Sequence, residues 1–198
     1  MLNRKLILIM SITMFAPRVA LAHVGLGDAH DALHGFLHPI LGLDHILAMI
    51  TVGLLAANLG GRARWAVPVS FVSMMLAGGI AAMSGMILPF SELGVAMSVI
   101  MLGGLLSSRV RLPVAYAAAL AGIFAIFHGY AHGLEMPQDA SGISFALGFL
   151  TATASLHIAG LCIGLGIAKL SHPAASKITT MGGGAIVIAG IALISSLI

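Results

Sequence analysis

Charged residues are scarce in this sequence, and their scarcity decides the class of protein first. They make up only 8% of the 198 residues, while 60% are hydrophobic and the mean hydropathy is +1.11. A soluble domain is about a quarter charged and about half apolar. This composition excludes an ordinary soluble enzyme, and a net charge of only +3 gives no indication of a nucleic-acid partner.

Thiols and nucleotide-binding motifs are also missing. Cys162 is the only cysteine, which excludes an internal disulfide and a thiolate-rich metal site. No G-x-x-x-x-G-K-[ST] loop is present, so the chain does not hydrolyse ATP by that route. Glycine, in contrast, is abundant, with 25 residues that often occur in pairs within apolar segments. This pattern favours close-packed membrane helices over the strands of a barrel.

Long apolar segments predict an all-α bundle of six membrane-spanning helices in one domain, residues 23–198. The spans are expected at about 37–58, 66–88, 92–108, 113–130, 142–168 and 178–198. The connections at 60–65, 107–112 and 169–177 carry Lys and Arg. The alternate connections carry no Lys or Arg and hold Glu92, Glu135 and Asp139 instead. Basic residues in short loops mark the cytoplasmic side. We therefore expect a bacterial cytoplasmic-membrane protein with both termini outside the cytoplasm.

The first 22 residues have the layout of a secretory signal peptide. Arg4 and Lys5 precede an apolar run, and Ala20-Leu21-Ala22 forms a cleavage site. Cleavage would leave His23 as the first residue, with an amine and an imidazole that together can chelate a metal. Because Arg18 is unusual near a cleavage site, an uncleaved first helix is the alternative.

Residues 23–36 form a short polar lead-in before the first span. It carries His23, His30 and His34, and the spacing of His30, His34 and His38 would place three imidazoles along one stripe of a helix. These residues either capture metal outside the membrane or form a solvated amphipathic helix. The sequence favours neither interpretation.

The stretch from His38 to Met49, H-P-I-L-G-L-D-H-I-L-A-M, opens the first span. Ionisable residues at membrane depth face a bundle interior or a polar cavity and are functional candidates. On a continuous helix, His38 and His45 would share one face about 10 Å apart along the axis, with Met49 one turn beyond. Asp44 could bind a metal or orient His45. The alternative, polar residues that only join helices, is less favoured for three such residues within eight positions.

A second polar cluster ends the fourth span. His128 and His132 are spaced i, i+4, so they could grip one ion, although Gly129 and Gly133 are expected to loosen the helix there. The expected topology places this cluster at the depth of the first. His157 would lie about 22 Å into the fifth span. The histidines thus form a graded series toward the core, and imidazole suits Ni, Co, Cu and Zn.

These motifs resemble a known family. The pattern His38-Pro39-x-x-Gly42-x-Asp44-His45-x-x-x-Met49 matches the signature of the HupE/UreJ nickel/cobalt permeases at every fixed position, and the stretch from 128 to 135, ending at Glu135, is similar to the second conserved region of that family. The resemblance covers the whole chain. It implies a transporter rather than an enzyme, with Ni²⁺ or Co²⁺ as substrate and no permanently bound cofactor. The metal would supply hydrogenase or urease through their maturation proteins.

Two other functions stay open from the residues alone. An intramembrane zinc hydrolase would hold Zn²⁺ with His128, His132, Asp44 and His157 around an open water position. A bis-His haem protein would ligate iron with histidines from two helices. The sequence does not choose nickel over cobalt, does not show proton coupling, and leaves a homo-oligomer open.

Overall fold

The computed structural model describes residues 32–108, 110–136 and 140–197, and these residues form helices and no strands. The expected all-helical fold is confirmed. The expected signal peptide, His23 and His30 lie outside the described residues. The helices are α2 (Ala32–Leu41), α3 (Leu43–Leu59), α4 (Ala63–Met83), α5 (Ser91–Ser108), α6 (Val114–Glu135), α7 (Ala140–Ile167) and α8 (His172–Ser195).

Five of these helices, α4 to α8, are long and apolar enough to cross a membrane. The sixth candidate span is the pair α2 and α3, which pass the same test together but meet at a bend of 84°. The protein is therefore a multi-pass membrane protein with five straight candidate spans and one broken one.

The break at Gly42 differs from the straight first span expected at 37–58. Gly42 has extended backbone angles, φ −86° and ψ 118°, which interrupt the helix between Leu41 and Leu43. His38 and His45 therefore do not share one helical face, and that prediction was wrong. Their ring centroids still lie 6.5 Å apart, because α2 and α3 both pack against α7.

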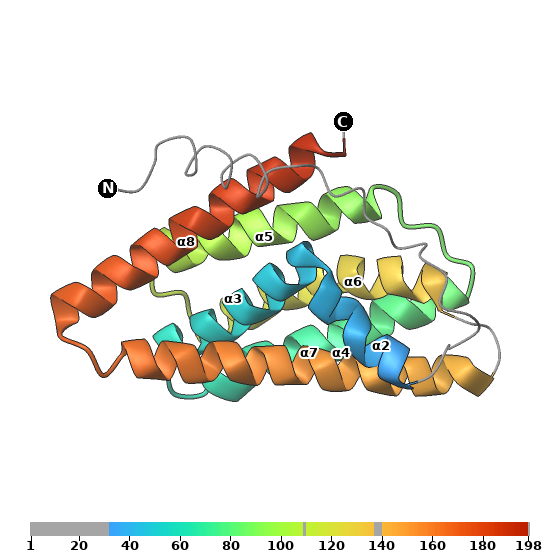
Figure 1. Ribbon diagram of the computed structural model, residues 1–198, viewed down its shortest axis with the longest axis horizontal. Coiled ribbons are helices and arrows are strands. Elements are labelled where there is room, and N and C mark those ends of the chain that lie inside the picture. The colour runs from blue at the N-terminus through green and yellow to red at the C-terminus, as the bar shows by residue number, and fades with distance from the viewer. Residues whose placement is uncertain (1–31, 109, 137–139, 198) are drawn as a thin grey trace, which may run out of the picture.

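Three helix pairs account for most of the packing: α4 with α6, α3 with α7, and α5 with α8 (Figure 1). Glycines let the backbones touch. A Cβ added to Gly129 would collide with the carbonyl oxygen of Met75, and one added to Gly160 would collide with that of Ile50. Close approach of small residues stabilises helix pairs in a membrane, where the hydrophobic effect does not drive them together.

Helix α6 is continuous to Glu135, so the expected loosening at Gly129 and Gly133 was wrong. Both glycines instead face α4, since a Cβ on Gly133 would lie 2.6 Å from the carbonyl oxygen of Gly79. The unbroken helix holds His128 and His132 one turn apart.

Charges divide between the two ends of the bundle, because the short connections alternate between these ends (Figure 1). The described basic residues lie in or beside the connections at one end: Arg62, Arg64, Arg111, Lys169 and Lys177. The described acidic residues lie at the other, where α3 and α5 begin and α6 ends: Asp44, Glu92 and Glu135. The acidic end also carries the histidine cluster.

Candidate metal centre

Six polar side chains meet at the acidic end of the bundle. They come from α2, α3 and α6: His38, Asp44, His45, His128, His132 and Glu135. Side-chain exposure falls from 55% at Glu135, through 25% at His38, to 9% at His132. His128 is fully buried. The cluster, which we call the histidine funnel, thus leads from the surface into the core.

His45 lies at the centre of the histidine funnel. Its ring centroid is 4.4 Å from that of His132 and 5.0 Å from that of His128. His38 in turn lies 4.7 Å from His132. Imidazoles from three helices are therefore in mutual contact, although the sequence placed them in two separate motifs.

Asp44 sets the proton position on His45. Nδ1 of His45 donates to Oδ1 of Asp44 at 2.6 Å, and the same oxygen accepts the backbone N–H of His45 at 2.9 Å. An ionised carboxylate only accepts hydrogen bonds, so the ring proton is on Nδ1 and a lone pair is left on Nε2. Gly42 makes room for this pair, because a Cβ there would lie 2.8 Å from Nδ1 of His45.

The proton position on His45 determines the one on His132. The Nε2 atoms of the two rings are hydrogen-bonded. Since Nε2 of His45 carries the lone pair, His132 donates the proton and keeps its own lone pair on Nδ1. This buried Nδ1 has no hydrogen-bond partner among the described residues. A carboxylate on one helix thus prepares a metal-binding nitrogen on another.

The mouth of the funnel offers a three-atom ligand set. Oε2 of Glu135 lies 3.3 Å from Nε2 of His38 and 3.7 Å from Nδ1 of His132. One ligand atom from each of these residues lies within 4.8 Å of the others. Two imidazole nitrogens and one carboxylate oxygen suit a divalent transition-metal ion.

Ser98 sets the proton position on His128, as Asp44 does on His45. The Ser98 hydroxyl donates to the carbonyl oxygen of Val95 at 2.6 Å, so its oxygen accepts from Nε2 of His128 at 2.8 Å. The lone pair of His128 is therefore on Nδ1, which is buried and has no hydrogen-bond partner in the described part of the chain. The bottom of the funnel thus presents the free lone pair of His128 beside the nitrogen of His45 that accepts a hydrogen bond from His132.

Of the other residues singled out in the sequence, His34 borders this cluster, whereas Met49 and His157 lie apart from it. His34 is exposed on α2, with its ring 6.4 Å from that of His38. Met49 is fully buried in the hydrophobic core. His157 packs against Phe71 and makes no ring contact with the funnel. A metal role for Met49 therefore has no geometric support here.

Sequence reasoning missed Ser98, Phe149 and Glu92. Ser98 is the only hydroxyl-bearing residue of α5 between its first turn and Ser107, and this isolation was the available signal. The Phe149 ring lies 4.4 Å from that of His132 and covers it from α7. Glu92, in the first turn of α5, interacts electrostatically with Asp44 and Glu135 and adds to the negative charge of this end.

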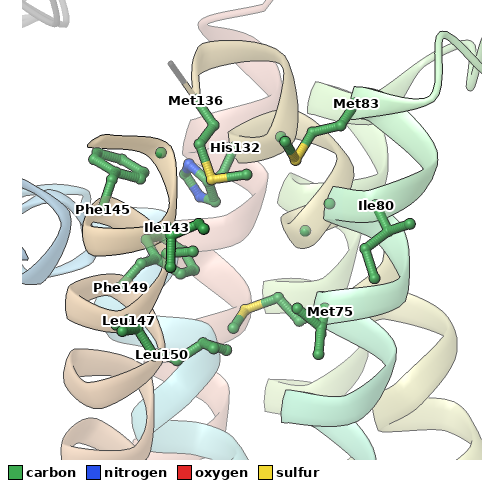
Figure 2. A pocket seen from close by; sticks show the side chains of 16 residues that line it. Met75, Ile80, Met83, His132, Met136, Ile143, Phe145, Leu147, Phe149 and Leu150 are labelled. Carbon is green, nitrogen blue, oxygen red and sulfur yellow. The ribbon is translucent and has the colours of Figure 1, made fainter. Parts of the chain in front are cut away.

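A cavity of about 420 Å³ lies beside His132, between α4, α6 and α7. Figure 2 shows Met75, Met83 and Met136 reaching into this space, with His132 on its wall. Its lining is largely apolar, as the phenylalanines and leucines of α7 show. A hydrated ion would gain little from this lining, because apolar side chains do not replace its water ligands.

The two alternative functions do not match this arrangement. Asp44 is hydrogen-bonded to His45, and among the described residues the three ligand atoms that lie within 4.8 Å of one another belong to His38, His132 and Glu135. The four zinc ligands of a hydrolase are therefore not assembled. The Nε2 atoms of His45 and His132 are within hydrogen-bond distance, which leaves no room for a porphyrin between them.

Fold and site together define a multi-pass helical membrane protein with a funnel of histidines and carboxylates. The chain belongs to the HupE/UreJ family, whose model, "HupE / UreJ protein", matches residues 10–193. The family indicated by the sequence motifs is thereby confirmed. Protein HupE of Rhizobium leguminosarum bv. viciae is 44% identical over 179 residues, which cover 90% of this chain and 91% of that protein. No solved structure matches the chain.

Proposed function

We propose that this protein is a secondary permease that takes up Ni²⁺ or Co²⁺ through the histidine funnel and supplies hydrogenase or urease maturation. Membership of the HupE/UreJ family supports an accessory transport role rather than an enzymatic one. The observation that carries the proposal is the set of prepared lone pairs on His45, His128 and His132, which converge at one end of an apolar bundle.

The funnel offers two partial sites, and transport needs such sites to be weak. An ion would first bind Glu135, His38 and Nδ1 of His132 at the mouth. It would then pass to the nitrogens of His45 and His128 below, breaking the hydrogen bond that Nε2 of His132 donates to Nε2 of His45 and leaving that proton on His132. Neither set closes a full coordination shell from protein atoms, so the ion keeps water or exchanges ligands and is released readily.

The direction of transport follows from the charges at the two ends. Basic connections mark the cytoplasmic side, so the funnel would open outside the cytoplasm, with both termini outside and the chain in the bacterial cytoplasmic membrane. The acidic mouth would then attract cations from outside. Capture by His23, His30 and His34 remains a prediction about a segment that lies mostly outside the described residues.

Uptake of radioactive Ni²⁺ and Co²⁺ into proteoliposomes tests the proposal. We expect saturable uptake in vesicles that contain the protein, competition between the two metals, and no competition by Mg²⁺, because Mg²⁺ prefers oxygen ligands. Uptake no faster than into empty vesicles would overturn it.

Ser98→Ala tests how the bottom of the funnel is prepared. The variant loses the acceptor for Nε2–H of His128, so the proton is free to move to Nδ1 and block the metal-binding nitrogen. Loss of such an orienting partner typically weakens metal binding about 10–100-fold. We expect a rise of that size in the Ni²⁺ concentration for half-maximal uptake.

The matched control for this prediction is Ser107→Ala, the same change on the same helix. The Ser107 hydroxyl donates to the carbonyl oxygen of Thr180, on α8 and away from the histidines. We expect unchanged uptake in this variant. Equal losses in both variants would mean that Ser98 only supports helix packing.

A further inference from the structure

Phe71 contacts both His157 and the histidine funnel. Its side chain, on α4, is fully buried. The centroid of its ring lies 5.5 Å from that of His128 and 5.1 Å from that of His157. One aromatic ring therefore contacts both the deepest funnel histidine and the next imidazole along the bundle.

His157 lies well below the funnel by two independent measures. Along α7 it is eight residues beyond Phe149, which covers His132, and eight residues of helix span about 12 Å. Along α3, its backbone carbonyl packs against Gly53, which is eight residues beyond His45. His157 thus belongs to a different level of the bundle.

His157 also lacks any partner of its own. Its side chain is almost wholly buried, and neither ring nitrogen has a hydrogen-bond partner among the described residues. Leaving a buried polar group unsatisfied costs about 1–3 kcal/mol. A histidine kept in this state is accounted for if a ligand binds it during the working cycle.

His157 shares a cavity with a residue of the basic end of the bundle. It lines a cavity of about 320 Å³ between α4 and α7, together with Arg64 and Ser73. Arg64 lies in the first turn of α4, at the end opposite Glu135. A cation at His157 would be close to this positive charge, which favours its release over its retention.

We propose that Phe71 is the barrier of the permeation path and that His157 is a separate inner metal-binding station, open only to the Arg64 side. This inference rests on the proposed transport function. An ion moves from Nδ1 of His128 to a nitrogen of His157 only when the Phe71 ring turns aside. With the ring in place, an apolar plug keeps water and other ions from passing between the two compartments.

Thiol labelling tests this division without any metal. In a chain that carries Cys162→Ala, His157→Cys places a single thiol at the inner station. A charged, membrane-impermeant methanethiosulfonate reagent is then added from one side of the membrane at a time, with right-side-out and inside-out vesicles. We expect labelling from the Arg64 side and none from the Glu135 side.

Truncating the Phe71 side chain should let the reagent reach residue 157 from the Glu135 side as well. With Phe71→Ala added, we expect labelling from the Glu135 side to appear, at a rate at least tenfold above the background measured with Phe71 intact. Leu102→Ala, another truncation of a fully buried side chain, should leave that rate unchanged. Phe71→Leu, which preserves most of the packing, should give a smaller increase and serves if the alanine variant does not fold.

Labelling from both sides while Phe71 is intact would overturn the proposal, as would an unchanged Glu135-side rate in a folded Phe71 variant. Because the reaction needs no nickel, this result is independent of the uptake test. If nickel uptake failed but labelling remained one-sided, the proposed substrate would be refuted and the proposal that Phe71 is a barrier would still hold.

Discussion

His45→Ala is expected to abolish nickel uptake while the protein still inserts and folds. The His45 ring touches those of His132 and His128, so an ion passing from the mouth to the bottom of the funnel must pass this residue. Loss of the ring removes a ligand. It also removes the acceptor for Nε2–H of His132, so the proton of His132 is no longer held on Nε2. Since loss of an orienting partner alone costs about 10–100-fold, we expect a loss in uptake rate above about 100-fold.

The measurement is the initial rate of ⁶³Ni²⁺ uptake into cells, normalised to the amount of protein in the membrane. His172→Ala is the matched control, because His172 is exposed at the start of α8 and far from the funnel. Thermal unfolding in detergent shows whether the His45 variant is folded. A folded variant that keeps wild-type uptake would exclude His45 from the path.

Asp44→Ala has the second-largest expected effect, and Asp44→Asn reveals its cause. Alanine removes the oxygen that accepts two hydrogen bonds from His45, so both the tautomer of His45 and the lone pair on His132 are no longer held. We expect about a 10–100-fold loss of nickel affinity. An asparagine oxygen can accept the same two bonds without the negative charge, so Asp44→Asn should retain most of the affinity.

Nickel binding to the purified variants by titration calorimetry, together with uptake rates, checks this pair. Glu92→Gln is the control for loss of a carboxylate at the same end of the bundle, and we expect only a small effect because Glu92 bonds to no funnel histidine in the described residues. Equal losses in the asparagine and alanine variants would show that Asp44 acts through its charge, as a direct ligand.

The sequence was informative about the individual polar residues and less so about how they meet. Ionisable side chains are costly in apolar helices, so His38, Asp44, His45, His128 and His132 were recognisable one by one. The break at Gly42 was not, because a glycine inside an apolar run is compatible with a continuous membrane helix. Gly129 and Gly133 led to the wrong prediction of a loosened helix, because the sequence does not show that both glycines pack against α4.

The funnel also depends on contacts between helices that lie far apart in the chain. The bond between His45 and His132 joins residues 87 positions apart, and the bond between Ser98 and His128 joins residues 30 apart. Helical periodicity describes one helix at a time, so it relates His128 to His132 but neither of them to His45 or Ser98. For the same reason the sequence did not predict that Phe71, one of many apolar residues, contacts His128 and His157.

By itself, then, the sequence determined the class of the protein, its helical fold, its family and most of the candidate ligands. These follow from the cost of placing charge in an apolar bundle and from motifs that are local in the chain. Only the tertiary structure decided which nitrogens carry lone pairs, that Glu135, His38 and His132 form the mouth, and that Phe71 packs against both His128 and His157. Hydrogen-bond networks and barriers of this kind arise where different helices touch, and those contacts are set by packing of the whole bundle.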